Sequence, residues 1–263
     1  MQTSAGRSTQ FQATLQSEWV KPLRDEGNAT HLVCFPFAGG GVGPYRPWTA
    51  EISSAIDISA VLLPGREQRL LESPIGCPTS VCEAITRELL GVIKPGTKIV
   101  FFGHSMGSLL AYDIAVRLKK QHNIDIAMLI ASGRQAPHVN LGGDIHKSDE
   151  QTFIRELKRM GGTPDIVFED DELRGLVIPM LRSDYQILET YAPEKFELLD
   201  CPILTCTGDV DTEVSPDELA GWSELTHNAV IHEVFSGDHF YLTDNIQRNR
   251  LTSVIEHYIN VML

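Results

Sequence analysis

The chain has 263 residues, a length that a single α/β domain commonly fills. Its hydrophobic fraction of 42% and charged fraction of 22% are close to those of folded globular proteins, which excludes a disordered or fibrous chain. With 22 basic against 35 acidic residues the formal net charge is −13, and such a field repels polyanions, which argues against nucleic acid or an anionic membrane surface as the main partner.

The first thirty residues are polar and show no periodicity, so we expect residues 1–30 to form a loose arm before the first core strand. No apolar core of a signal peptide follows Met1, and no run approaches the ~20 apolar residues of a membrane-spanning helix. We therefore expect a cytoplasmic protein, not bound to a membrane, in which residues 31–263 form one domain.

From His31 onward, short apolar runs of strand length alternate with longer segments of helical periodicity. The runs cover residues 31–35, 58–63, 98–102, 126–130, 203–206 and 230–235. Such alternation is typical of βαβ units, and strands that are apolar on both sides suit a sheet covered on both faces. The sequence thus predicts an α/β fold with a mostly parallel central sheet flanked by helices.

Helices are predicted between these strands. Residues 80–93 and 215–225 open with capping-box patterns, Ser80 with Glu83 and Ser215 with Glu218, and residues 106–120 have helical spacing.

One region breaks the alternation of strands and helices. Between the strands at 126–130 and 203–206 we find helical patterns only, at 148–160 and at 173–191, the latter interrupted at Pro179. Long insertions in compact domains are usually functional. We expect an inserted helical lid over about residues 136–198.

The motif that carries chemistry is Gly103-His104-Ser105-Met106-Gly107, a match to G-x-S-x-G. Alone it is weak, because with Gly near 7% of residues chance gives it in roughly one chain in ten of this length. Here it follows the strand at 98–102 and opens the helix at 106–120, which is the nucleophile elbow of the α/β-hydrolase fold. The sequence predicts Ser105 as a nucleophile, the alternative being a merely structural glycine-rich turn.

A serine nucleophile needs a histidine base and a carboxylate, which in this fold follow in the order serine, acid, histidine. His239 lies in a loop after the strand at 230–235 and fits the base. Three other late histidines fit less well, because they fall in a helical pattern, inside a strand and in an earlier loop: His257, His232 and His227. For the acid, the loop at 208–214 offers Asp209, Asp211 and Glu213.

Acyl transfer also needs two donors for the oxyanion, usually the N–H after the nucleophile and one from the loop after an early strand. The first is the backbone N–H of Met106. The second belongs to the glycine-rich loop at 35–41, where we choose Phe37 over Ala38; a simple glycine-rich turn is the alternative.

From about His31 to the C-terminus, the chain closely resembles the type II thioesterases of nonribosomal peptide and polyketide synthases, and the related medium-chain thioesterases of fatty acid synthase. The motifs that carry the resemblance are Phe35-Pro-Phe-Ala-Gly-Gly-Gly41, Leu63-Pro-Gly-Arg66, Phe102-Gly-His-Ser-Met-Gly107, Met160-Gly-Gly-Thr-Pro164, Pro179-Met-Leu-Arg-Ser-Asp184 with Glu189 and Tyr191, and Gly237-Asp-His-Phe-Tyr241. The resemblance places the acid three residues after Gly208, at Asp211, with Asp209 as the runner-up that stabilises the turn. It also identifies the inserted region as the helical lid of this family.

The resemblance implies a thioester hydrolase whose partner is an acyl or peptidyl carrier protein. The substrate would itself bring the phosphopantetheine arm, the intermediate would be an acyl-Ser105, and no metal or other cofactor would be needed. Such enzymes remove short, stalled or wrong acyl units, or release finished chains, in antibiotic, siderophore or fatty acid synthesis. We expect a monomer, and a basic face of Arg155, Lys158, Arg159 and Arg182 that docks an acidic carrier.

Three alternatives stay open from sequence: an ester or lipid hydrolase with the same triad, an acyltransferase that uses an alcohol or amine instead of water, and a non-catalytic binding module. The last is disfavoured because candidates for all three triad positions are present.

Overall fold

A computed structural model gives the structure of residues 17–139 and 142–263. Residues 1–16 of the predicted arm, and 140–141 within the predicted lid, lie outside the described residues.

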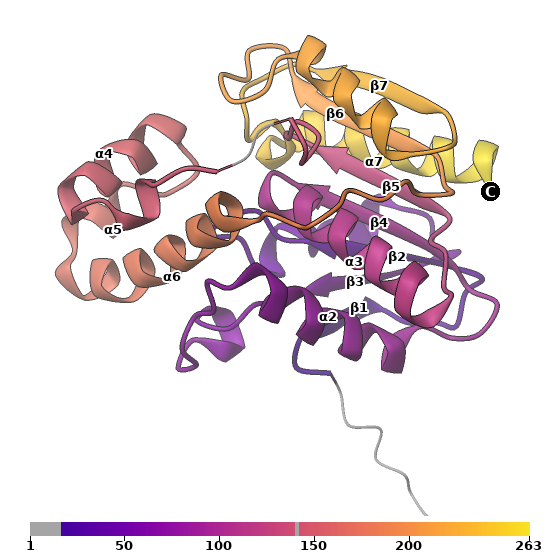
Figure 1. The fold of residues 1–263 in the computed structure, drawn as a ribbon, viewed down its shortest axis with the longest axis horizontal. Helices are drawn as coiled ribbons and strands as arrows, with labels where there is room; N and C mark the ends of the chain where they lie inside the picture. Colours follow the sequence, from indigo (N-terminus) through magenta and orange to yellow (C-terminus); the bar gives the residue numbers. More distant parts are fainter. Residues whose placement is uncertain (1–16, 140–141) are drawn as a thin grey trace, which may run out of the picture.

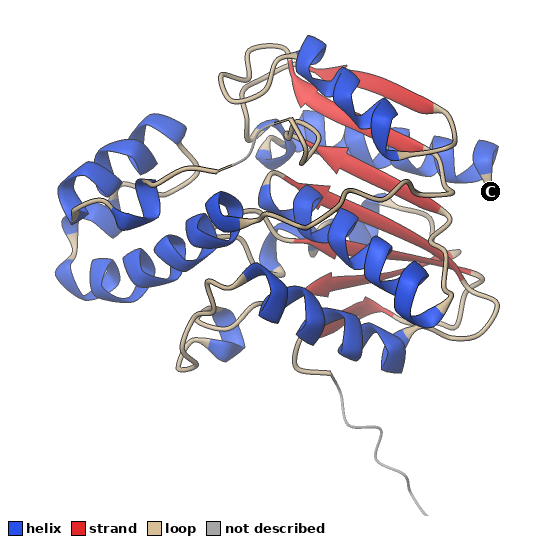
Figure 2. Cartoon of the chain, in the orientation of Figure 1, coloured by secondary structure: helices blue, strands red, loops and turns tan. Residues whose placement is uncertain are grey.

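The core is a seven-stranded sheet in the order β1-β3-β2-β4-β5-β6-β7. Its strands are β1 (Val20–Arg24), β2 (Thr30–Phe35), β3 (Ile56–Val61), β4 (Lys98–His104), β5 (Met128–Ser132), β6 (Ile203–Gly208) and β7 (Val230–Phe235). All neighbouring pairs are parallel except β1 and β3, which are antiparallel (Figures 1 and 2). The predicted mostly parallel sheet is therefore confirmed.

Strand β1 corrects the expectation of a loose arm over residues 1–30, because the folded domain already includes residues 20–24. Val20 pairs with Val61 and is buried, whereas the rest of β1 is only partly buried or exposed. The Arg24 guanidinium secures this edge by donating to the carbonyl oxygens of Ile56 and Ser53, at 2.6 Å each for Nη2. An edge strand with one buried face has a short, weak apolar pattern.

The helices and 3-10 turns include the five segments predicted to be helical, with some changes at their ends, and others that were not predicted. They are α1 (Trp48–Glu51), α2 (Pro78–Val92), α3 (Met106–His122), α4 (Glu150–Met160), α5 (Ile166–Glu169), α6 (Asp171–Thr190) and α7 (Asn245–Met262), with 3-10 turns η1 (Gly43–Tyr45), η2 (Glu67–Arg69), η3 (Ile145–Lys147), η4 (Pro216–Leu225) and η5 (Tyr241–Thr243). Within the described part of the chain, none of the helices is long and apolar enough to cross a membrane.

The two predicted capping boxes have different outcomes. Ser215 and Glu218 form theirs, although the segment behind them is a 3-10 helix. Ser80 does not cap α2, which starts earlier, at Pro78 after Cys77. A proline fits the first helical turn, where its missing N–H is not needed.

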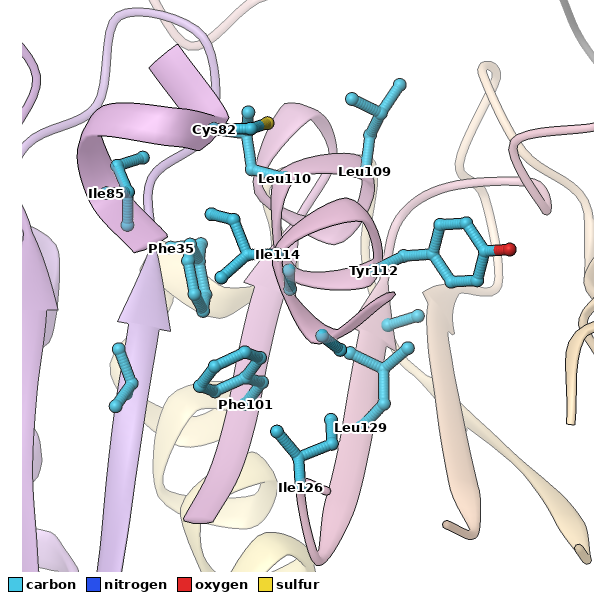
Figure 3. Close-up of a cluster of buried hydrophobic side chains, with 14 of the residues drawn as sticks. Phe35, Cys82, Ile85, Phe101, Leu109, Leu110, Tyr112, Ile114, Ile126 and Leu129 are labelled. Atoms are coloured by element: carbon cyan, nitrogen blue, oxygen red, sulfur yellow. The ribbon is translucent and has the colours of Figure 1, made fainter. Parts of the chain in front are cut away.

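Helices cover both faces of the sheet. One face packs against α2, α3 and η4, and Figure 3 shows Phe35 of β2 and Phe101 of β4 against Ile114 of α3. Phe35 and Phe101 meet edge to face, with ring centroids 4.8 Å apart. The other face packs against α1, α7 and η5. The loops that contain Ser105, Asp211 and His239 follow the carboxyl ends of the parallel strands β4, β6 and β7.

Between β5 and β6, the described residues contain helices and no strand, as expected for the inserted segment (residues 136–198). In Figure 1, α4 and α5 stand away from the sheet and α6 leads back towards it. The inserted segment has a small apolar core of its own, which includes Phe153, Phe168 and Ile178. Helix α6 runs without a break through Pro179, where we expected an interruption.

Candidate functional site

Ser105 lies on the sharp turn between β4 and α3. Its backbone has φ 52° and ψ −115°, a conformation that costs a non-glycine residue free energy and is found at active sites. The turn is held by a hydrogen bond from the Ser105 N–H to the Ser132 carbonyl oxygen, at 2.7 Å. The strand end therefore presents the Ser105 hydroxyl at the edge of the sheet where a nucleophile elbow would place it.

The two glycines of the motif are required by close packing of the backbone. A Cβ atom at Gly103 would lie 2.1 Å from the carbonyl oxygen of Gly107, and one at Gly107 would lie 2.3 Å from that of Phe35. Only residues without a Cβ atom allow this approach. The spacing of the motif is thus a steric requirement of the turn.

Asp211 and His239 meet at the carboxyl ends of β6 and β7. His239 Nδ1 lies 2.9 Å from Asp211 Oδ2, and both side chains are buried. The other carboxylate oxygen of Asp211 accepts the N–H groups of Glu213 and Val214, at 2.8 and 3.2 Å. Because the carboxylate accepts a hydrogen bond from the Nδ1–H group, the Nε2 atom of His239 is left to act as a base.

The Asp211 carboxylate is stabilised in its charged form. Burial by itself raises its pKa, but the hydrogen bond and charge of His239, with the two N–H donors, outweigh burial and hold the pKa below its usual value. A charged Asp211 keeps the His239 ring oriented and stabilises the ring when it becomes protonated.

The other candidates have structural contacts. Asp209 accepts the N–H of Gly237 at 2.9 Å, which ties the loop after β6 to the loop after β7. His232 Nδ1 lies 2.6 Å from the Thr205 hydroxyl within the sheet. His257 lies on α7 and is exposed, as is His227. Of the late histidines and the two aspartates, His239 and Asp211 alone contact each other.

The proposed oxyanion donors belong to Met106, which follows Ser105 in the chain, and to Phe37, which lines the same cavity as Ser105. Met106 is the first residue of α3, where backbone N–H groups have no partner inside the helix. Phe37 lies in the loop after β2, which is tightened by a bond from the Gly40 N–H to the Phe37 carbonyl oxygen, at 2.8 Å. The Phe37 ring packs edge-on against His104 and Phe240, at 5.8 and 5.4 Å between centroids.

Arg66 and Asp184 hold this loop in place, a role that the sequence did not predict for them. Arg66 makes two hydrogen bonds to the Asp184 carboxylate, at 2.7 and 2.8 Å, and both side chains are buried. Asp184 also accepts the Gly39 N–H at 2.7 Å, and Arg66 donates to the Gly40 carbonyl oxygen at 2.9 Å. Both residues belong to motifs noted above, but their 118-residue separation conceals the contact.

His104, next to the nucleophile, forms a second buried polar group. Its Nδ1 lies 2.8 Å from the Ser132 hydroxyl, which lies 2.7 Å from the Tyr241 hydroxyl. Its ring lies 5.0 Å from that of His239. Burial, with the charge of His239, lowers the pKa of His104 far below its usual value, so His104 is neutral at physiological pH.

A cavity of about 460 Å³ lies beside the candidate catalytic residues. Ser105, His239 and Phe37 line it from the sheet, and Leu157 and Leu181 line it from the inserted segment. The hydrogen bond of the His239 side chain goes to Asp211 and not to the Ser105 hydroxyl, and catalytic hydrogen bonds of this kind often tighten only when the substrate binds. A nucleophile, an oriented base and backbone donors at one cavity suit acyl transfer.

Residues 30–261 match the family described as "Thioesterase domain". The chain belongs to the thioesterase family. It is 34% identical to thioesterase PikA5 of Streptomyces venezuelae over 86% of this chain and 80% of that protein. It is 32% identical to the gramicidin S biosynthesis protein GrsT of Aneurinibacillus migulanus, over 81% of this chain and 83% of that protein.

A solved structure is equally similar. The type II thioesterase BorB from the borrelidin biosynthetic cluster is 33% identical, with a TM-score of 0.81, over 91% of this chain and 97% of BorB. This thioesterase therefore has the mostly parallel fold of its family, and the activity to be explained is hydrolysis of an acyl thioester by a serine enzyme.

Proposed function

We propose that this thioesterase is a type II enzyme that removes acyl groups from the phosphopantetheine arms of carrier proteins. The observation that carries the proposal is the Asp211–His239 pair at 2.9 Å beside Ser105 on a strained turn, all under the inserted segment. Relatives named for gramicidin S biosynthesis and anguibactin biosynthesis support the carrier-bound substrate.

In the proposed first half-reaction, Ser105 Oγ attacks the thioester carbonyl carbon while His239 Nε2 accepts the hydroxyl proton. The oxyanion accepts hydrogen bonds from the backbone N–H groups of Met106 and Phe37. The carbon–sulfur bond then breaks, and His239 returns the proton to the departing sulfur. The products are an acyl ester on Ser105 and a free thiol on the arm.

In the second half-reaction, His239 takes a proton from water, whose oxygen attacks the acyl-Ser105 carbon. The same two N–H groups stabilise the second oxyanion, and the proton returns to Ser105 as the free acid leaves. This chemistry requires neither a metal nor a diffusible cofactor, so activity should survive EDTA treatment followed by desalting.

The inserted segment is proposed to act as a lid over the arm. A second cavity of about 310 Å³ adjoins the first and shares Phe37, Ala38 and Leu181 with it. The second cavity is bounded by the loop of Arg66 and by α6, and its lining is largely apolar. Two adjoining cavities could hold the acyl group and the end of the arm on opposite sides of the reacting carbon.

The proposal is tested with a carrier protein loaded with short acyl groups, by following release of the free thiol and of the acid by mass spectrometry. The wild-type enzyme should pass through an acyl adduct on Ser105, and Ser105→Ala should show neither the adduct nor turnover. An adduct on another residue would overturn the assignment. Rates on matched oxygen esters distinguish a general esterase, and product analysis with an added alcohol or amine distinguishes an acyltransferase.

A further inference from the structure

Three buried polar side chains form a network behind the candidate catalytic residues. His104 Nδ1 lies 2.8 Å from the Ser132 hydroxyl, which lies 2.7 Å from the Tyr241 hydroxyl. The three residues are at most 2% exposed, and the lining of the cavity beside Ser105 does not include them. The His104–Ser132–Tyr241 network therefore lies behind the surface that the substrate meets.

Each member of the network belongs to a segment that carries part of the site. His104 precedes Ser105 at the end of β4, and Ser132 is the last residue of β5. The Ser132 carbonyl oxygen accepts the Ser105 N–H at 2.7 Å. Tyr241 follows His239 by two residues and opens the turn η5. The network therefore ties the loop of His239 to the two strand ends that hold the nucleophile.

The His104 ring also packs against two of the catalytic loops. Its centroid lies 5.0 Å from that of His239 and 6.1 Å from that of Phe240, both in the loop after β7. It meets the ring of Phe37, in the loop after β2, edge-on at 5.8 Å. Aromatic rings whose centroids are within about 7 Å of one another are in contact. A turn of the His104 ring would therefore remove a surface against which His239 packs.

Stability alone does not explain a histidine at this position. Although the ring lies beside the backbone of His239, its Nε2 atom is buried and has no hydrogen-bond partner among the described residues. Burying a polar atom in this way costs free energy, and an apolar side chain would fill the space without that cost. What the histidine adds is the hydrogen bond between Nδ1 and Ser132, which fixes the rotation of the ring.

The His104 ring is neutral, which suits a neighbour of the base. Burial, with the charge of His239, holds the pKa of His104 far below its usual value. In the proposed mechanism, His239 becomes positively charged when it takes the proton of Ser105. A neutral ring can support His239 at a centroid distance of 5.0 Å without opposing that charge, whereas a charged side chain would oppose it.

Building on the role proposed above for His239 as the base, we propose that His104 is a positioning residue. Through Ser132 and Tyr241, and through its ring contact, it holds the loop of His239 where the base can reach the Ser105 hydroxyl. Small displacements of a catalytic group from its reacting geometry lower the rate strongly, by about 100-fold for about 1 Å. The network is therefore expected to affect kcat and not substrate binding.

The test measures hydrolysis of the propanoyl thioester of N-acetylcysteamine by two variants of similar shape. An asparagine side chain can accept or donate a hydrogen bond near the position of Nδ1, and a leucine side chain cannot. His104→Leu should lower kcat about 100-fold, with KM within about twofold of the wild type. His104→Asn should restore part of the loss, with a kcat about tenfold above that of His104→Leu.

Two smaller substitutions test the rest of the network. Tyr241→Phe and Ser132→Ala should each lower kcat about tenfold without raising KM. The double variant should lose less than the product of the two single effects, because both changes break the same connection. Tyr112→Phe is the matched control, since the Tyr112 hydroxyl is also buried and donates to the Glu197 carbonyl oxygen at 2.7 Å. It should lower stability and leave kcat unchanged.

Values of kcat are expressed per folded enzyme, with the folded fraction taken from urea unfolding. A kcat of Tyr241→Phe equal to that of Tyr112→Phe would overturn the proposal. So would equal kcat values for His104→Leu and His104→Asn, or a loss that the folded fraction explains completely. If His104→Leu does not fold, Tyr241→Phe and Ser132→Ala decide.

His239→Ala separates this inference from the function on which it rests. It should abolish turnover of the same thioester, and an inactive His239→Ala beside a fully active Tyr241→Phe would reject the positioning role alone. A His239→Ala variant with wild-type turnover would instead reject His239 as the base, and the positioning role with it.

Discussion

Asp184 of α6 and Arg66 of the loop after β3 form a buried, two-pronged ion pair that joins the inserted segment to the loop of the proposed oxyanion donor. The pair thus connects α6 of the inserted segment to the loop after β2, and both line the cavities beside Ser105. Through Gly39 and Gly40, the same two side chains hold the backbone beside Phe37.

Asp184→Ala should destabilise the fold by about 3–5 kcal/mol, because it leaves the buried Arg66 charge without a partner. Urea unfolding measures the change, and Arg66→Met in the same chain should recover part of it. Lys147→Ala, which breaks the exposed pair with Asp144, is the control and should leave the midpoint unchanged. A midpoint equally unchanged in Asp184→Ala would contradict a stabilising role.

Asp211→Asn should lower kcat about 10⁴-fold with little change in fold, because an amide donates where His239 needs an acceptor. Asp209→Asn should lower kcat far less, since Asp209 contacts the Gly237 N–H and not the His239 ring. Thiol release from an acyl carrier protein measures both variants. The opposite ranking would assign the acid to Asp209.

His104 should make the fold less stable in mild acid. Below pH 6.5 the unfolded chain binds a proton at His104 and the folded protein does not, so stability falls as the pH falls, by up to about 1.4 kcal/mol per pH unit. His104→Gln removes this proton difference, and its stability should change less between pH 7.5 and pH 5.5 in urea unfolding. His31, whose pKa burial also lowers, keeps its contribution in both proteins.

The same substitution at the exposed His257 is the control, and it should preserve the wild-type pH dependence. A His104→Gln variant that loses as much stability in acid as the wild type would show that His104 is protonated when folded.

Arg155 and Lys158 on the exposed face of α4 are the better candidates for carrier docking. Arg159 is already paired with Glu156 and Glu213, and Arg182 donates to the carbonyl oxygens of His146 and Ser148. Arg155→Glu with Lys158→Glu should raise KM for an acyl carrier protein, most strongly at low salt. The kcat/KM for an N-acetylcysteamine thioester should not change, and equal effects on both substrates would exclude docking.

Much of the central fold could be predicted, because its parallel strands are apolar on both sides and are separated by helical patterns. Strand β1 was missed because one of its faces is exposed and because its partner is β3, far along the chain. The start of α2 was missed because Cys77 and Pro78 leave no polar cap to recognise.

The candidate site also has features that the sequence predicts and features that it does not. Local geometry requires the glycines around Ser105, so the motif predicts that turn from sequence. The contact of Asp211 with His239 depends on two neighbouring strand ends. The order of serine, acid and histidine along the chain predicted where to look for the two residues, and the family resemblance selected Asp211. The Arg66–Asp184 pair depends on packing of the inserted segment against the domain, which has no signal in local sequence.

Helix α6 has a mechanical consequence. Its 20 residues, Asp171–Thr190, span about 30 Å at 1.5 Å per residue, and they run unbroken through Asp184, which ties the helix to the loop after β2. Because the helix is continuous, a tilt of its Asp171 end would also move Asp184, whose carboxylate accepts the Gly39 N–H. A displacement of α6 at Asp184 would therefore also displace the backbone of Gly39, in the loop that contains the proposed oxyanion donor Phe37.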